Sequence, residues 1–256
     1  MCQFFKYLRT CVILGLLYFV LGHSLPAQAA SQINPQLEQQ VLQILREHPE
    51  VILESVQAYK QQQQEQFKQA QQAFLQNLKI NPQVVIGNSP TIGLAQSKIV
   101  LVEFSDFQCP YCAEAHKTLK PLLVKHHNDL IFVYKHFPLT AIHAEAMPAA
   151  QAAWAANQQG KFWEYQDALF ANQKQLGEDL YLDIAKKLNL NLPKFERDRL
   201  LANTAIGQDI QLAKKLGIAG TPSFVMNSQN FSGAVQLSDI ESKLADTNNN
   251  STKVRG

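Results

Sequence analysis

Cysteine is scarce in this 256-residue chain, and so are long apolar runs and an excess of either charge. Of the four cysteines, Cys2 and Cys11 lie in an N-terminal segment with the features of an export signal. Loss of that segment on export would leave Cys109 and Cys112 with no other thiol to bond with. The sequence therefore excludes a small fold held by several disulfides, and it excludes a zinc site built from two cysteine pairs.

The N-terminal segment predicts export. Lys6 and Arg9 precede an apolar run at residues 11–21, and an A-x-A cleavage motif ends at Ala29. This run is shorter than the roughly 20 apolar residues that a membrane-spanning helix needs. We expect residues 1–29 to be a signal peptide; if it is not cleaved, it anchors the chain in the membrane. In either case the rest of the protein is periplasmic or otherwise extracytoplasmic.

The charge balance is close to neutral. The chain has 23 basic and 21 acidic residues. Removal of residues 1–29 takes away two basic residues and no acidic one, which leaves equal numbers of both. A neutral chain lacks the electrostatic attraction that proteins use to bind phosphate backbones, so nucleic acid is not expected as a partner.

Residues 30–80 predict a helical extension. Asn34 followed by Pro35 is the preferred order of a helix N-cap and first helical residue. His48 and the proline after it interrupt this helix, and a second one is predicted from about Pro49 to Leu78, where neither glycine nor proline occurs in the interior.

The second helix is rich in glutamine and carries a narrow apolar stripe in a 4-3-4 spacing. The stripe comprises Ile52, Val56, Tyr59, Phe67, Ala70, Phe74 and Leu78, with Gln63 at the one position that is not apolar. Such a stripe packs against a second copy, folds back on its own domain or stays in solvent. Because a helix this polar needs a partner to bury its stripe, we expect homo-oligomer formation through residues 31–80.

The remaining chain predicts an α/β domain. A buried strand at 98–104 leads into the C-x-x-C and a helix at 113–127, and the strand that follows is expected to pair in parallel with the first. The other predicted segments are a short strand at 84–86, a second buried strand at 130–139, a helical insertion at about 142–216, strands at 223–226 and 231–235, a closing helix at 238–244 and a disordered tail at 246–256.

The position of the cysteine pair predicts redox chemistry. Where a strand turns into a helix, free N–H groups and the helix dipole stabilise a thiolate, so Cys109 is the expected nucleophile. Cys112 lies one turn further along and can attack a mixed disulfide formed on Cys109. Pro110 and Tyr111 lie between them and tune the reduction potential through the stability of the thiolate.

Two other interpretations of the pair are weaker. His116 lies one helical turn after Cys112 and would be a third zinc ligand, but no fourth ligand has suitable spacing, so no metal is expected. A static disulfide that closes so short a loop would remove little entropy from the unfolded chain.

Two motifs together reveal a resemblance. The sequence C-P-Y-C at 109–112 follows a buried strand, and G-T-P-S-F at 220–224 precedes another. With the helical insertion between them, residues 83–245 resemble the DsbA-like branch of the thioredoxin superfamily. The extension at 30–80 is similar to the oligomerising helices of its ScsC-like members.

The resemblance implies a thioredoxin fold with an insertion, no cofactor and further site residues. The bond between Thr221 and Pro222 is expected to be cis and to lie against the cysteine pair. Glu103 and Lys135 are expected to form a buried pair beneath it that relays protons to Cys112. Thr before the proline and Pro-Tyr between the cysteines differ from DsbA itself, which leaves the direction of electron flow open.

Two functions follow as hypotheses. The first is an exported thiol-disulfide oxidoreductase, an oxidase or isomerase that acts on cysteines of secreted polypeptides and exchanges electrons with a membrane thiol-redox partner. The second is a non-catalytic oligomeric scaffold that holds client proteins in the groove beside the cis-proline.

Overall fold

The computed structural model describes residues 34–94, 96, 97, 99–227, 240 and 242. They belong to two compact units, one that ends at Tyr59 and one that begins at Lys60. Of the predicted closing helix, Ile240 and Ser242 are described, and both are helical. The predicted export signal, the strand at 231–235 and the tail at 246–256 lie outside the described residues.

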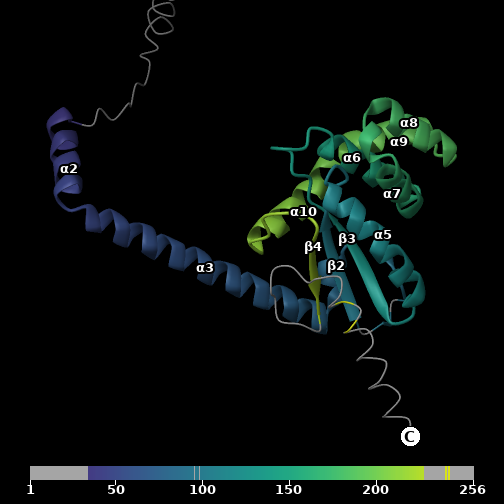
Figure 1. Cartoon of the computed structure of the whole chain (residues 1–256), viewed down its shortest axis with the longest axis horizontal. Coiled ribbons are helices and arrows are strands. Elements are labelled where there is room, and N and C mark those ends of the chain that lie inside the picture. Colours follow the sequence, from purple (N-terminus) through teal and green to yellow (C-terminus); the bar gives the residue numbers. More distant parts are fainter. Residues whose placement is uncertain (1–33, 95, 98, 228–239, 241, 243–256) are drawn as a thin grey trace, which may run out of the picture. The chain divides into compact units, whose positions relative to one another are not determined.

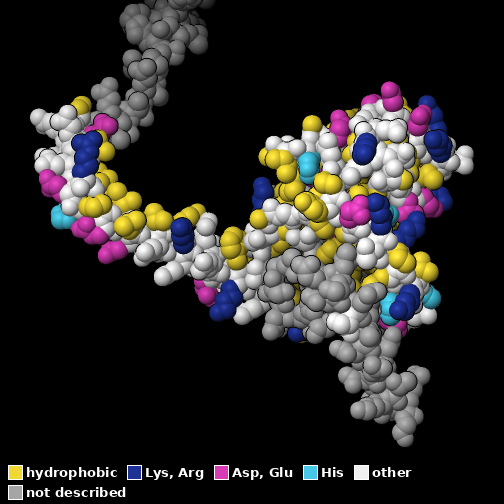
Figure 2. All heavy atoms as spheres, viewed as in Figure 1, with side chains coloured by type: hydrophobic (Ala, Val, Ile, Leu, Met, Phe, Trp, Pro, Cys, Tyr) yellow, Lys and Arg dark blue, Asp and Glu magenta, His cyan; other side chains and the backbone are white. Residues whose placement is uncertain are grey.

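The first unit contains helix α2 (Pro35–Glu47) and the start of α3 (Pro49–Ile80). Asn34 caps α2 as predicted, because its side chain accepts a hydrogen bond from the N–H of Gln36 at 3.0 Å. Both predicted helices are confirmed. No residue of α2 is buried, and the apolar residues in the first part of α3 are exposed, as the yellow side chains in Figure 2 show.

The last part of α3 belongs to the second unit and packs on its core. Phe74 and Leu78 are buried. The ring of Phe67 lies beside Gly217, whose φ of +73° is the left-handed conformation that glycine adopts without strain. The predicted stripe is therefore divided, since its second half folds back on its own domain and its first half is exposed.

The predicted strand at 84–86 is wrong, because these residues form part of a short helix, α4 (Pro82–Ile86). Pro82 at the first helical position favours this start, and Gly87 with a φ of +54° ends the helix. The strand propensity of two valines and an isoleucine is overridden by packing, since Val85 and Ile86 are buried in the core.

Within the described residues, the sheet has four strands in the order β1-β3-β2-β4, of which β2, β3 and β4 are labelled in Figure 1. The strands β2 (Ile99–Ser105) and β3 (Leu130–His136) are parallel, as predicted, and every residue of both is buried. The short edge strand β1 (Thr91–Ile92) and β4 (Ser223–Met226) are antiparallel to their neighbours. Helix α5 (Pro110–Lys125) connects β2 to β3.

The two faces of the sheet have different helical covers. On one, here called the α5 face, Leu119 and Leu123 of α5 pack with Leu101 and Phe132. On the other, the α10 face, residues of α3, α4 and α10 pack on β2 and β3; these are Phe74, Leu78, Val85, Ile86, Ala213 and Leu216, against Val100, Val102, Phe104, Ile131 and Val133.

The predicted insertion is helical and lies between β3 and β4. It comprises α6 (Ala146–Asn157), α7 (Phe162–Ala171), the short 3₁₀ helix η1 (Gln173–Gln175), α8 (Glu178–Lys187), α9 (Leu192–Leu201) and α10 (Asn203–Lys215). Seven alanines of α6 are buried, which lets its neighbours approach closely. None of the described helices has the length and apolar character needed to cross a bilayer.

Candidate active site

The cysteine pair lies where β2 gives way to α5, as predicted. Cys109 is the N-cap of α5, and Pro110 is the first helical residue, where a missing N–H costs nothing. The carbonyl of Cys109 accepts the N–H of Cys112 at 3.1 Å, which closes the first turn. Both cysteines are free thiols and are largely buried, whereas the Tyr111 side chain between them is 73% exposed.

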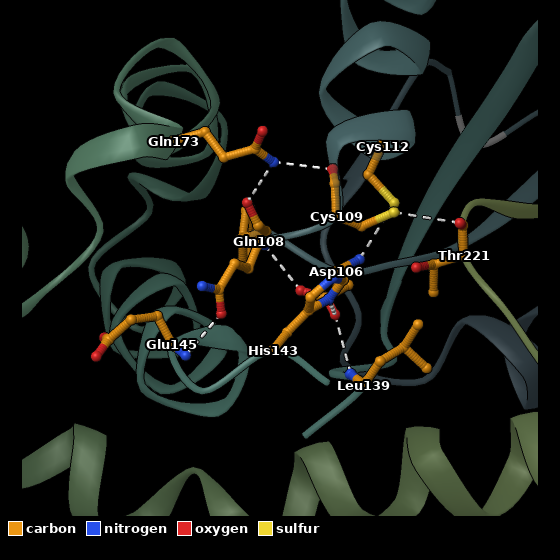
Figure 3. A network of polar contacts seen from close by, with 10 residues as sticks. Asp106, Gln108, Cys109, Cys112, Leu139, His143, Glu145, Gln173 and Thr221 are labelled. Atoms are coloured by element: carbon orange, nitrogen blue, oxygen red, sulfur yellow. Dashed lines mark hydrogen bonds and ion pairs between the residues drawn. The ribbon is translucent and has the colours of Figure 1, made fainter. Parts of the chain in front are cut away.

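The bond between Thr221 and Pro222 is cis, as expected, and it lies beside the pair. In the thiol form, Sγ of Cys109 donates to the carbonyl oxygen of Thr221, 3.3 Å away (Figure 3). Pairing of β4 with β2, in which Ser223 faces Phe104, brings this distant segment to the start of α5. Thr221 and Pro222 therefore form one wall of the site.

The two thiols differ in acidity. The pKa of Cys109 is lowered to about 5, chiefly by a hydrogen bond from Cys112, with contributions from the Thr221 side chain and nearby N–H groups. Burial, the same hydrogen bond and the charge of Glu103 raise the pKa of Cys112. At neutral pH, Cys109 is therefore the thiolate and Cys112 holds its proton, the division that an attacking and a resolving cysteine require.

Glu103 lies on the α5 face and is buried. Burial raises its pKa to about 7, partly offset by the Ser105 side chain. The charge of Glu103 raises the pKa of Cys112, and that of Cys109 raises the pKa of Glu103, so the carboxyl group lies within electrostatic reach of both sulfurs. A carboxyl group that titrates near neutral pH is suited to accept and return a proton.

The predicted pairing of Glu103 with Lys135 is wrong. Neighbouring residues of a strand point to opposite faces, and the register aligns Glu103 with Tyr134 and Lys135 with Phe104. Lys135 therefore points to the α10 face, where its Nζ lies 3.1 Å from Oδ1 of Asp209 in α10. The buried base has a partner, but the partner comes from the helical insertion.

Asp106, which the motif analysis missed, anchors the loop before the cysteines. Its carboxylate accepts the N–H of Leu139 at 2.9 Å, the N–H of Gln108 at 2.8 Å and Nδ1 of His143 at 2.7 Å (Figure 3). The contact with Gln108 was predictable from the sequence, because an aspartate that accepts the N–H two residues later forms a common turn. The contacts of Asp106 with Leu139 and His143 had no signal in the sequence.

Gln173 also supports the site and was missed. Its Nε2 donates to the carbonyl oxygens of Phe107 and Cys109, both at 2.8 Å. It thereby ties η1 to the start of α5 (Figure 3). His116, considered above as a zinc ligand, instead pairs with Asp167 at 2.9 Å.

The chain matches the family model described as "Thioredoxin" over residues 85–246. A solved thioredoxin-like oxidoreductase from Silicibacter pomeroyi is 32% identical, with a TM-score of 0.56 over 64% of this chain and 94% of that one. Proteus mirabilis ScsC in a transitional conformation is 26% identical, with a TM-score of 0.56 over 86% and 96%.

A curated relative, Na(+)/H(+) antiporter NhaA 3 of Salinispora tropica, is 35% identical over 155 residues, which is 59% of this chain and 24% of that protein. The chain spans about a quarter of the length of such relatives, so the match concerns one segment of them. Fold, motif positions and solved relatives agree, and the chain belongs to the thioredoxin superfamily, in its branch of DsbA-like thiol-disulfide oxidoreductases.

Proposed function

We propose that this protein is an exported thiol-disulfide oxidoreductase that oxidises or reshuffles cysteines of secreted polypeptides. The observation that carries the proposal is the unequal pair, in which Cys109 has a pKa of about 5 and Cys112, one turn deeper, keeps its proton. A pair of this kind separates the thiol that meets the substrate from the thiol that releases it.

In the oxidising direction, a substrate thiolate attacks Sγ of Cys109 in the disulfide form of the protein. The bond between Cys109 and Cys112 breaks, and a mixed disulfide forms between substrate and Cys109. Cys112 leaves as a thiolate and takes up a proton. A second substrate thiolate then attacks the substrate sulfur of the mixed disulfide and releases the Cys109 thiolate. The substrate has lost two electrons, and the protein has gained them as a dithiol.

In the isomerising direction, the Cys109 thiolate attacks a wrong disulfide of the substrate, which releases one substrate thiolate and forms the mixed disulfide. Either the correct substrate thiolate then displaces Cys109, or Cys112 attacks Cys109 and frees the substrate in reduced form. Because a low thiol pKa stabilises the reduced protein, a Cys109 pKa between roughly 3.5 for DsbA and roughly 7 for thioredoxin favours an intermediate reduction potential.

Thr221 and Pro222 are proposed to receive the substrate. The contact between Sγ of Cys109 and the Thr221 carbonyl shows that this backbone lies within reach of the reacting sulfur. An extended peptide bound there would present its cysteine to Cys109. Pro110 and the exposed Tyr111 lie between the two cysteines at the start of α5 and are proposed to contribute to substrate contact and to the reduction potential.

Export is proposed from the signal features of residues 1–29, and it implies a membrane thiol-redox partner that resets the pair after each cycle. Cys109 would also exchange electrons with this partner, because it is the more acidic of the two thiols. The chemistry needs no cofactor, since the two sulfurs hold both electrons.

Self-association through residues 31–80 is proposed from the first unit. A groove of about 310 Å³ is lined by Leu45, Val51, Ile52, Ser55, Val56 and Tyr59. Val56→Glu would place a charge in this groove, whereas Gln57→Glu places one on an exposed polar position beside it. Sedimentation of the full chain is expected to show an oligomer for wild type and Gln57→Glu and a monomer for Val56→Glu. A monomeric wild type would exclude this assembly.

The same groove supports the second candidate, an oligomeric scaffold that assembles through residues 31–80 and holds clients beside the cis-proline without redox chemistry. Cys109→Ser and Cys112→Ser separate the two functions. With a reduced, unfolded protein as substrate in a glutathione redox buffer, Cys109→Ser is expected to form no disulfides beyond those that the buffer forms. With a substrate that carries wrong disulfides, Cys112→Ser is expected to accumulate a mixed disulfide, because its Cys109 thiolate attacks and no second thiol releases the substrate. If Cys109→Ser restores native disulfides as well as wild type does, the oxidoreductase assignment is wrong and the scaffold remains.

A further inference from the structure

The hydroxyl of Ser105 is buried and has no well-aligned hydrogen-bond partner among the described residues. Ser105 is the last residue of β2. The N–H that follows it, that of Asp106, points at Sγ of Cys112 from 3.5 Å. A buried hydroxyl without a partner costs free energy, so its retention beside a reacting sulfur needs an explanation.

Ser105 lies among the acids of the α5 face. Glu103 is two residues earlier and therefore on the same face, and the register aligns these two residues with Tyr134 and His136 of β3. All four side chains are buried. The Ser105 hydroxyl favours the ionised forms of Glu103, Cys112 and Tyr134, lowering the pKa of each against the larger effect of burial, so it lies close to all three.

Building on the proposed function, we propose that the Ser105 hydroxyl carries the proton between the Cys112 thiol and the Glu103 carboxylate. A hydroxyl is both donor and acceptor, so it can take one proton while it gives another. As Cys112 attacks the mixed disulfide, its S–H bond breaks and the proton passes to Ser105 Oγ. The original proton of Ser105 passes to Glu103, which becomes neutral, and Ser105 is unchanged. The oxidising direction reverses these transfers.

The neighbouring polar groups do not compete for this proton. Burial raises the pKa of Tyr134 far above the neutral range, so its phenol stays protonated. Burial and the charge of Lys135 lower the pKa of His136 to about 3, so its ring stays neutral. Cys109 is bonded to the substrate during this step. Among the described groups on this face, Glu103 is therefore the base whose pKa matches the task.

Glu103 can exchange the proton with solvent through a cavity of about 440 Å³ between α5 and α7. Glu103 lines this cavity together with His116, Lys120 and Asp167, and Asp167 pairs with both His116 and Lys120. The route from Cys112 through Ser105 and Glu103 therefore ends at a cavity that neither Cys109 nor Thr221 lines.

The test uses the full chain with glutathione linked to Cys109 as a mixed disulfide, and it measures glutathione release as Cys112 closes the ring. Ser105→Ala is expected to slow release at neutral pH by about a hundredfold, the lower end of the range typical of general acid-base effects. In wild type the rate is expected to rise with pH through about 7, where Glu103 loses its proton. Ser105→Ala is expected to lose this inflection.

Three controls separate proton transfer from structure. Ser105→Thr keeps the hydroxyl and is expected to restore both the rate and the inflection. Tyr134→Phe removes another unpartnered buried hydroxyl of the same face and is expected to leave ring closure near the wild-type rate. Attack of Cys109 on a small disulfide, which precedes the Cys112 step, is expected to be unchanged in Ser105→Ala.

Several results would overturn the proposal. These are wild-type ring closure in Ser105→Ala, an inflection near pH 7 that survives in it, or equal slowing of both steps. A wild-type chain that never closes the ring overturns this proposal and the proposed function together. One that closes the ring through Ser105 but does not act on reduced polypeptides overturns only the proposed function.

Discussion

The two faces of β2 and β3 bury charge in opposite ways. On the α10 face, Lys135 and Asp209 form an ion pair in which the side chains are 8% and 13% exposed. On the α5 face, Glu103 has no basic partner among the described residues, and its pKa is raised to about 7. A buried charge with a partner is a structural element, whereas a buried acid without one, beside a reactive sulfur, marks a functional site.

The largest expected effect is on the α10 face. Asp209→Ala leaves Lys135 buried without its partner and is expected to lower the free energy of unfolding by about 3–5 kcal/mol. Denaturant unfolding measures this loss. Replacement of both residues, as in Lys135→Met with Asp209→Leu, is expected to recover most of it. If the single variant is as stable as wild type, the ion pair does not have the structural role assigned here.

On the α5 face, removal of the charge is expected to stabilise the fold. The pKa of Glu103 is about 7 in the folded protein and about 4.5 ordinarily. Between these values the unfolded chain ionises while the folded one keeps its proton, so stability falls as pH rises from 4.5 to 7. Glu103→Gln lacks this loss. It is expected to be more stable than wild type by about 3 kcal/mol above pH 7, with no such gain below pH 4.5.

Unfolding of both reduced proteins at the two ends of this pH range tests the prediction. Glu103→Gln is also expected to slow ring closure by Cys112, so a gain in stability would accompany a loss in rate. A variant that is less stable than wild type at every pH would show that Glu103 has a structural partner after all.

The next effect concerns the pKa of Cys109. Because the hydrogen bond from Cys112 is the largest cause of the low Cys109 pKa, Cys112→Ala is expected to raise the pKa of Cys109 from about 5 toward that of an ordinary cysteine. The ultraviolet absorbance of the thiolate, followed against pH, measures it. An unchanged pKa would mean that Thr221 and the N–H groups of α5, and not Cys112, stabilise the Cys109 thiolate.

The smallest effect is expected at the surface. Lys117 and Glu114 of α5 form an ion pair at 2.6 Å whose side chains are 69% and 71% exposed. Glu114→Ala is expected to change the free energy of unfolding by less than about 0.5 kcal/mol, because water screens exposed pairs. A loss as large as that of Asp209→Ala would mean that burial is not what distinguishes the pair on the α10 face.

Local patterns were sufficient for much of the architecture. The order of Asn34 and Pro35 predicted the start of α2, and the apolar runs predicted β2 and β3 as strands buried on both faces. The strand predicted at 84–86 failed because Pro82, Gly87 and packing outweigh the propensity of β-branched residues over so short a segment. The 4-3-4 spacing of the apolar stripe did not distinguish the exposed half of α3 from the half that packs on the core.

By itself, the sequence determined where the two cysteines lie, at the junction of a strand and a helix, because the apolar run and the C-P-Y-C spacing are signals within a few residues. Which segment would lie opposite them followed from the family resemblance, which C-P-Y-C and the motif around Pro222 support together. Only the tertiary structure decided the partners of the buried charges. A strand that is apolar on both faces does not reveal which way Glu103, Ser105 or Lys135 points until its neighbour is in register. Asp209 and Gln173 reach the sheet and the site from helices remote in sequence, through packing that no local pattern encodes.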